Sequence, residues 1–270
     1  MSDTQTTSNA DGNCTGAPSE TTKSKAKRKP SGYVLWEGDS PIDGAPIVAI
    51  ATTKSSNAKT GNMLQTWILR RDMSPVEAVK TDADRSICGD CPLRGSGGKD
   101  RACYVVWAQA PQSIYHAYRR GSYPKADFED AKALGRDRHV RLGAYGDPAL
   151  VPFAIWNPLL VNATGWTGYT HLWRLESDLE GGFELKGILM ASVEDIVGAK
   201  YAQANGWRTF RVGRPDWIDP DISLKTEIPC PSAKVKCSDC NLCRGASLPA
   251  KSITIEVHGR GKSKFNVEQS

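Results

Sequence analysis

Seven of the eight cysteines in this 270-residue chain lie in two short segments, and clustered thiolates bind metals. The second segment, CPSAKVKCSDCNLC, contains Cys230, Cys237, Cys240 and Cys243. Its last three cysteines have the spacing C-x-x-C-x-x-C, which brings three thiolates into one short arc, as in ferredoxin-type sequences. Four thiolates complete either a [4Fe–4S] cluster or a tetrahedral zinc site. Zinc sites more usually separate two C-x-x-C pairs by a longer loop, so the spacing favours an iron–sulfur cluster, with zinc as the alternative.

The first segment, CGDCPLRGSGGKDRACY, supplies only three cysteines, Cys88, Cys91 and Cys103. A three-cysteine site either keeps one position of the metal open for substrate or water, or takes a fourth ligand from elsewhere in the fold. Both readings remain open from the sequence. The sequence also leaves open whether the two segments form one centre or two.

Polar side chains near the ends of expected strands are candidates for acid–base chemistry, because function in α/β barrels collects at the carboxyl ends of strands. Asp147 directly follows the apolar run RLGAY and is a candidate general acid or base, although an aspartate there can equally cap the next helix. His171 is a candidate base or ligand, or else a satisfied half-buried histidine, and Asp195 is a third catalytic candidate. Candidate residues for binding a substrate or its phosphate are Lys59, Tyr169, Arg174, Arg208 and Arg211.

The elements that would position these residues alternate between strands and helices. Apolar, β-branched runs predict strands at 33–38, 45–52, 63–70, 139–145, 166–173, 185–195, 207–213 and 252–259. Capping and glycine signals predict helices after Ser74, over 110–121, over 125–135, within 152–165 and over 197–206. This order predicts an α/β fold with a mainly parallel sheet. Because no strand is followed by a G-x-G-x-x-G turn, a complete or partial α/β barrel fits better than a doubly wound sheet.

The N-terminal residues 1–31 are rich in polar and basic residues and end in KSKAKRKP. They lack the apolar residues needed to pack, so a disordered basic tail is expected, with Cys14 as a bystander. Residues 32–270 are expected to form a single α/β metal-binding domain. Its cysteine-rich segments are 88–103 and 230–243.

Composition sets broad limits on function. A hydrophobic content of 39% and a charged content of 24% are typical of globular proteins. The net charge of +5 is compatible with a polyanionic partner. No apolar run approaches the roughly 20 residues of a membrane helix, and the first residues lack the apolar core of a signal peptide. We therefore expect a cytoplasmic protein with no membrane partner, in a reducing compartment where clustered thiols bind metal rather than form disulfides.

Several of these motifs together resemble a family of uncharacterised proteins carried by phages and plasmids, the phage gene-product-88 family. The resemblance covers about residues 45–260 and rests on CGDCP with CY, RLGAYGDPALVP, WTGYTHLWR, LMASVED, GWRTFRV and CPSAKVKCSDCNLC. It implies a mobile genetic element and metal binding by clustered cysteines, but no particular reaction. The layout is also loosely similar to radical S-adenosylmethionine enzymes and to tRNA-guanine transglycosylase-like proteins. The C-x-x-x-C-x-x-C motif for S-adenosylmethionine is missing, so that cofactor has no motif to support it, and the transglycosylase zinc motif is missing as well.

Three hypotheses about function follow. The first is a metal-cluster enzyme that modifies or processes a nucleotide or nucleic acid, DNA more than RNA. The second is a non-enzymatic nucleic-acid-binding protein of replication or regulation, whose metal centres stabilise the fold. The third is a redox sensor with a labile cluster.

Overall fold

The computed structural model describes residues 29–55, 59–217 and 225–265, so most of the predicted tail, with Cys14, lies outside the described residues. The strands of the described chain are β1 (Gly32–Asp39), β2 (Pro46–Thr52), β3 (Leu64–Arg70), β4 (His139–Tyr145), β5 (Gly165–Thr167), β6 (Tyr169–Thr170), β7 (Met190–Val193), β8 (Thr209–Gly213), β9 (Glu227–Pro229) and β10 (Ser252–Glu256).

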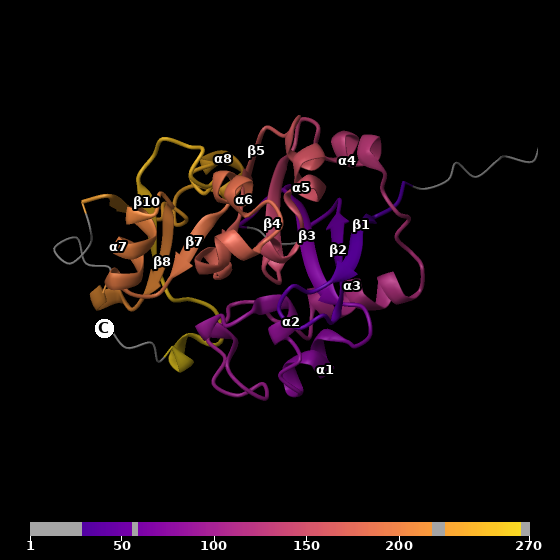
Figure 1. The fold of residues 1–270 in the computed structure, drawn as a ribbon, viewed down its shortest axis with the longest axis horizontal. Helices are drawn as coiled ribbons and strands as arrows, with labels where there is room; N and C mark the ends of the chain where they lie inside the picture. Colours follow the sequence, from indigo (N-terminus) through magenta and orange to yellow (C-terminus); the bar gives the residue numbers. More distant parts are fainter. Residues whose placement is uncertain (1–28, 56–58, 218–224, 266–270) are drawn as a thin grey trace, which may run out of the picture.

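These strands form two sheets of five strands each (Figure 1). The first has the order β1-β2-β3-β4-β5, in which β1, β2 and β3 are antiparallel neighbours and β3, β4 and β5 are parallel. The second has the order β6-β7-β8-β10-β9 and is parallel throughout. The predicted α/β class with mainly parallel pairing is therefore confirmed.

The two sheets meet at consecutive strands, β5 and β6, which are separated by Gly168 alone. The Gly168 N–H donates to the carbonyl of Cys243 (3.2 Å), and the Gly168 carbonyl accepts from the N–H of Met190 (3.0 Å). A Cβ at this position would lie 2.4 Å from a methyl carbon of Leu189, which explains the glycine. One short stretch of chain therefore belongs to both sheets.

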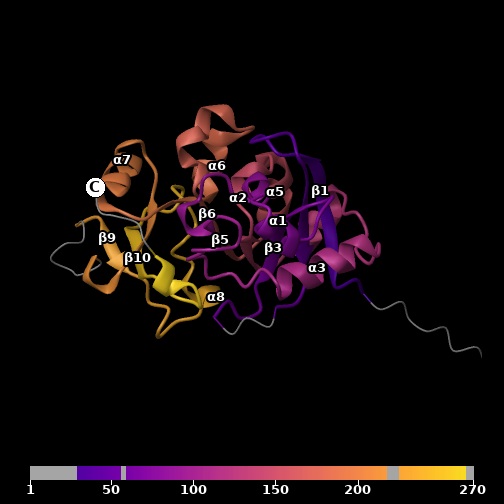
Figure 2. The same ribbon diagram turned by 90° about the horizontal axis from the view of Figure 1, so that it is seen from below.

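The α-helices connect the strands and cover the sheets. Figure 2 shows α6 and α7 on one side of the second sheet and the segment that carries α8 on the other. The helices are α1 (Pro75–Lys80), α2 (Arg85–Cys88), α3 (Ala110–Arg119), α4 (Phe128–Gly135), α5 (Phe153–Leu160), α6 (Gly182–Ile188), α7 (Ile196–Ala204) and α8 (Cys237–Cys240).

Two expected strands are shorter than the sequence predicts. The strand expected over 185–195 is β7 alone, because residues 185–188 belong to α6. The strand expected over 166–173 ends at Thr170, and a 3₁₀ segment, Leu172–Asp178, follows. In the first place the apolar run begins in a helix that precedes the strand, and in the second it continues past the strand into a helical segment. A short apolar run does not by itself distinguish a helix from a strand. The predicted cap at Ser74 is confirmed, since its hydroxyl accepts from the N–H of Glu77 (3.2 Å).

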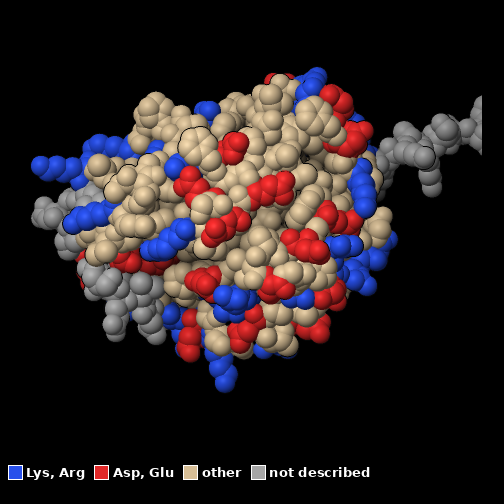
Figure 3. Space-filling model, in the orientation of Figure 1, with Lys and Arg blue, Asp and Glu red and all other residues tan. Residues whose placement is uncertain are grey.

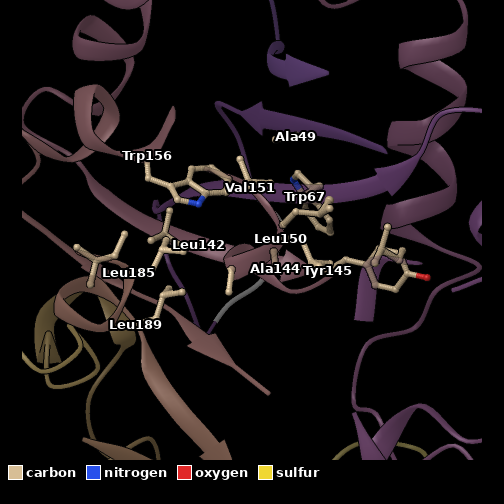
Figure 4. Packing of buried hydrophobic residues seen from close by; sticks show 14 of the residues in the cluster. Ala49, Trp67, Leu142, Ala144, Tyr145, Leu150, Val151, Trp156, Leu185 and Leu189 are labelled. Atoms are coloured by element: carbon tan, nitrogen blue, oxygen red, sulfur yellow. The ribbon is translucent and has the colours of Figure 1, made fainter. Parts of the chain in front are cut away.

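The main hydrophobic core lies against the first sheet and its helices and continues to α6, β7 and α7 (Figure 4). Trp156 of α5 is fully buried there, and its indole N–H donates to the carbonyl of Pro148 (3.0 Å). Strands β2 and β3 are buried along almost their whole length, as expected for continuous apolar strands at the centre of a sheet. The first sheet thus forms a rigid support for the residues that follow β3 and β4.

Within the ranges described above, no helix combines the length and the apolar character that crossing a membrane requires.

Candidate metal centre and cavity

All seven clustered cysteines line one cavity of about 440 Å³. We call Cys88, Cys91 and Cys103 the three-cysteine group, and Cys230, Cys237, Cys240 and Cys243 the four-cysteine group. The three-cysteine group follows α2, below β4 in Figure 1, whereas α8 of the four-cysteine group lies above, beside β5. Two segments that are far apart in sequence therefore meet at one cavity, from opposite ends of the strands.

The strands present alternate residues to this cavity, as the two-residue period of a β-strand requires. Its wall includes Arg141, Gly143 and Tyr145 of β4, Thr167 and Tyr169 of β5 and β6, Phe210 and Val212 of β8, and Ile253 and Ile255 of β10. Because β4, β5–β6, β7, β8 and β10 all contribute, the cavity lies against both sheets.

The three-cysteine group is built by a short helix and a tight turn. Helix α2 ends at Cys88, and Gly89 follows with a φ of 58°, a conformation that favours glycine. The turn brings the N–H of Cys91 to the carbonyl of Cys88 (3.3 Å). Cys103 returns to the same place because its N–H donates to the carbonyl of Leu93 (2.8 Å).

A buried ion triad holds this segment together. Asp84, which is 1% exposed, lies 2.6 Å from the Arg101 guanidinium and 3.3 Å from that of Arg94. Asp84 precedes α2, while Arg94 and Arg101 lie near the two ends of the loop between Cys91 and Cys103. One carboxylate thus fixes both ends of the cysteine segment.

The electrostatics of the three-cysteine group suit an anionic metal centre. Burial raises the pKa of Cys88 well above its usual range and also raises that of Cys103, whereas the nearby Arg101 opposes the rise at both thiols. Two buried donors beside this group, Arg101 Nε and the Tyr145 hydroxyl, have no hydrogen-bond partner among the described residues. Donors and a cation in this position would stabilise deprotonated thiols bound to a metal.

His171 lies beside the three-cysteine group. Its Nε2 is 3.7 Å from Cys91 Sγ and 2.8 Å from Glu194 Oε1. Burial alone would lower the pKa of His171, but Cys91 and Glu194 outweigh it and hold that pKa well above its usual range. The imidazole can therefore carry a proton next to the thiols, or serve as a fourth ligand. The sequence reading named His171 but not its pairing with Glu194.

The four-cysteine group is assembled by contacts between distant segments. Cys230 follows β9 and donates its N–H to the carbonyl of Thr254 (2.7 Å). Cys237 begins the single turn of α8 and donates its N–H to the carbonyl of Lys59 (3.0 Å). Cys243 is held by the hydrogen bond from Gly168 described above. The C-x-x-C-x-x-C segment is thereby docked against both sheets.

Burial raises the pKa of Cys243 to about 12, with the other three thiols of its group adding to the rise and a hydrogen bond to Tyr169 opposing it. Burial also raises the pKa of Cys237, and Arg141 opposes that rise. Each cysteine group therefore has one arginine beside it, Arg101 in the first and Arg141 in the second.

Two of the three candidate catalytic residues are helix caps. Asp147 accepts hydrogen bonds from the N–H groups of Ala149 (3.0 Å) and His171 (2.8 Å), so it caps the turn after β4 and fixes the end of β6. Asp195 accepts from the N–H of Gly198 (2.6 Å) at the start of α7. Asp147 lines the cavity and Asp195 does not.

The five candidate binding residues separate into two sets. Lys59 and Tyr169 line the cavity. Arg174 lies outside it, stacked over Trp173 with 3.8 Å between its guanidinium carbon and the ring centroid. Arg208 donates to the carbonyls of Gly245, Ala250 and Lys251.

Arg211 is fully buried and lies 2.8 Å from Glu227. It lies between Phe210 and Val212, which line the cavity, so it belongs to the opposite face of β8. We therefore leave Arg174, Arg208 and Arg211 out of the proposed site.

Sequence reasoning missed Arg101, Arg141 and Phe210. For Arg141 a signal was present, since the two-residue period of HVRLGAY places it on the same face as the tyrosine that ends the strand. Phe210 packs against both small apolar clusters of the second sheet, one that also contacts Cys91 and Cys103 and one that contains Cys243. Its side chain thus lies between the two cysteine groups.

Among the residues that the structure describes, no three His, Cys, Asp or Glu side chains converge closely enough to make a complete metal-binding group as they stand. In comparisons with known proteins, no family model matches the chain, and no match is found among curated proteins or solved structures.

Proposed function

We propose that this protein is a metal-cluster enzyme that holds an iron–sulfur cluster at the four-cysteine group and a second metal centre at the three-cysteine group. In this proposal a nucleotide or nucleic-acid substrate binds in the cavity between them. The observation that carries it is that all seven clustered cysteines, from two distant segments, line one cavity of about 440 Å³. Cavities of roughly 300–1,000 Å³ are the usual size for small ligands.

The donor set of each group supports a metal. Four thiols with the spacing C-x-x-C-x-x-C match the ligand count of a [4Fe–4S] cluster, and zinc is the alternative. Deprotonating buried thiols is costly, and Arg101 and Arg141 offset part of that cost at the two groups. The proposal rests on the shared position of the thiols around the cavity and not on a preformed coordination geometry.

The three-cysteine group is the proposed reacting centre, because acid–base groups surround it. A bound metal or cluster there would supply electron transfer or Lewis-acid chemistry. The residues of the chain would supply proton transfer and positioning. His171 and Glu194 would hold a proton beside Cys91, and Asp147 fixes the backbone of His171. The apolar wall of Val212, Ile255 and neighbouring side chains would limit access of water.

We further infer that the two sheets act as a partial α/β barrel around the cavity, since both contribute to its wall. The proposal also includes that the protein belongs to a mobile genetic element, and the resemblance to phage and plasmid proteins supports this part. On the face shown in Figure 3, acidic and basic side chains are interspersed and no broad basic surface is present. This face therefore offers no wide basic surface for a nucleic-acid backbone.

The test is anaerobic purification of the full chain, with iron, sulfide and zinc measured on one sample. A brown protein with a broad absorption band near roughly 400 nm and about four iron and four sulfide per cluster is expected. Adding S-adenosylmethionine to the reduced sample then tests whether the three-cysteine centre accepts a further ligand, by a change in its electron paramagnetic resonance spectrum. A colourless protein with stoichiometric zinc would overturn the iron–sulfur assignment, and a protein without bound metal would overturn the proposal as a whole.

A further inference from the structure

Arg141, which is partly exposed, differs in its partners from two buried arginines, Arg101 beside the three-cysteine group and Arg211 of the second sheet. Arg101 is paired with Asp84 (2.6 Å), and Arg211 is paired with Glu227 (2.8 Å). Among the described residues, no carboxylate lies within 4.0 Å of Arg141, and its guanidinium donates only to the hydroxyl of Tyr104. Arg141 nevertheless lines the cavity from the middle of β4.

A guanidinium inside a cavity without a carboxylate partner favours an anionic ligand. Arginine presents a planar fork of donors that fits a phosphate or carboxylate, and one partner leaves most of these donors available. The nearby thiol Cys237 is the alternative counter-ion, because Arg141 favours its ionised form. The test below separates these two roles.

Aromatic rings flank Arg141 on the wall of the same cavity. Tyr104 and His258 are stacked with their centroids 5.3 Å apart, and the Arg141 guanidinium lies 5.7 Å from the Tyr104 ring centroid. Tyr169 and Phe210 form a second pair, with centroids 4.2 Å apart. All four rings line the cavity. Exposed ring faces of this kind stack on nucleobases, whatever the base.

We propose that the cavity binds a single nucleoside monophosphate unit, with its phosphate on Arg141 and the Tyr104 hydroxyl and its base against Phe210 and Tyr169. This inference rests on the proposed function and names its substrate class. The cavity of about 440 Å³ is too small for a paired duplex segment. The unit is therefore either a free nucleotide or one nucleotide turned out of a strand, as in enzymes that act on flipped bases.

The experiment uses the full chain, purified anaerobically with its metal content measured. Equilibrium dialysis compares AMP, GMP, CMP and UMP with the four matching nucleosides, and a short single-stranded oligonucleotide separates a strand substrate from a free nucleotide. Nucleotides are expected to bind at least about tenfold more tightly than nucleosides, since the phosphate adds a charge-assisted contact. Arg141→Met should remove that difference and leave nucleoside binding unchanged.

The matched control is Arg174→Met, which removes an arginine that also lies by an aromatic ring but outside the cavity. It should leave nucleotide binding at the wild-type level. Phe210→Leu should weaken nucleotides and nucleosides alike, because it removes the base contact and keeps the charge.

Equal binding of nucleotides and nucleosides by the wild type would overturn the inference. So would an Arg141→Met variant that binds nucleotides normally, because the phosphate would then have another partner, and loss of iron from the four-cysteine group in that variant would assign Arg141 to the thiols alone. Metal content is read separately, so a metal-bound protein without nucleotide binding refutes this inference alone. A metal-free protein that binds nucleotides through Arg141 refutes the proposed function and supports the binding site.

Discussion

The two cysteine groups line one cavity, but they differ in what surrounds them. The three-cysteine group is built within one segment, braced by the buried carboxylate of Asp84, and has His171 and Glu194 beside it. The four-cysteine group is assembled from distant segments, and Arg141, Lys59, Tyr169 and Arg208 lie close enough to influence its thiols. The acid–base groups beside the three-cysteine group are the basis for proposing it as the reacting centre, with the four-cysteine group as a supporting centre.

The comparison predicts that the groups hold separate metals. Cys237→Ser with Cys240→Ser should remove the metal of the four-cysteine group and leave the other centre. Cys88→Ser with Cys91→Ser should do the reverse. Metal analysis and electron paramagnetic resonance of each double variant provide the measurement. If either pair removed all of the metal, the seven thiols would form a single centre.

The brace of the three-cysteine group should matter strongly for stability. Asp84→Asn leaves the buried Arg101 without its carboxylate partner and leaves Arg94 paired with Asp82 alone, so the free energy of unfolding should fall by about 3–5 kcal/mol. Urea unfolding monitored by circular dichroism gives the value. Asp90→Asn is the control in the same segment, because its ion pair with Arg85 is exposed and should contribute at most about 1 kcal/mol. Equal losses in the two variants would contradict the assignment of Asp84 as the brace.

His171→Gln should affect one centre only. Because His171 lies 3.7 Å from Cys91, its loss should weaken metal binding at the three-cysteine group by about 10–100-fold and alter the spectrum of that centre. The signal of the four-cysteine group should stay the same, which serves as an internal control. Titration of each variant with a chelator measures the affinities. A matching change at both centres would show that His171 acts on the whole fold.

The turns of the two groups should respond differently to substitution. Gly89→Ala places a side chain where φ is 58° and ψ is −142°, which should cost about 1–3 kcal/mol. Asn241, in the turn after α8, has a φ of 55° and a ψ of 14°, a region that glycine also adopts readily. Asn241→Gly should therefore stay within about 1 kcal/mol of the wild type, with the lost hydrogen bond to His139 accounting for the change. Thermal unfolding of both variants tests the contrast. A larger loss of stability in Asn241→Gly than in Gly89→Ala would contradict it.

Several features of the fold could be predicted from the sequence, because they depend on local patterns. The continuous apolar run at 45–52 and the alternating run at 139–145 contain strands, and Ser74 caps a helix. The limits of the strand at 185–195 could not be predicted, since LKGILM is apolar whether it forms a helix or a strand. Tertiary packing decides between the two there.

The site was less accessible to sequence reasoning because it depends on which face of a strand points inward. In WRTFRV the pattern alternates, but nothing local shows that Phe210 faces the cavity while Arg211 faces Glu227. His171 follows β6 and Glu194 follows β7, and nothing in either local sequence indicates that the two side chains pair. Metal binding by the cysteines stays a prediction. What the structure adds is the finding that both cysteine groups line one cavity.

The strand that passes from β5 through Gly168 into β6 also fixes a distance. Cys243 is hydrogen-bonded at Gly168, and Cys91 lies beside His171, three residues further along the same chain. At about 3.3 Å per residue, the two attachment points are roughly 10 Å apart. A continuous backbone therefore sets the spacing of the two cysteine groups, and a single small molecule between them can touch both ends at once.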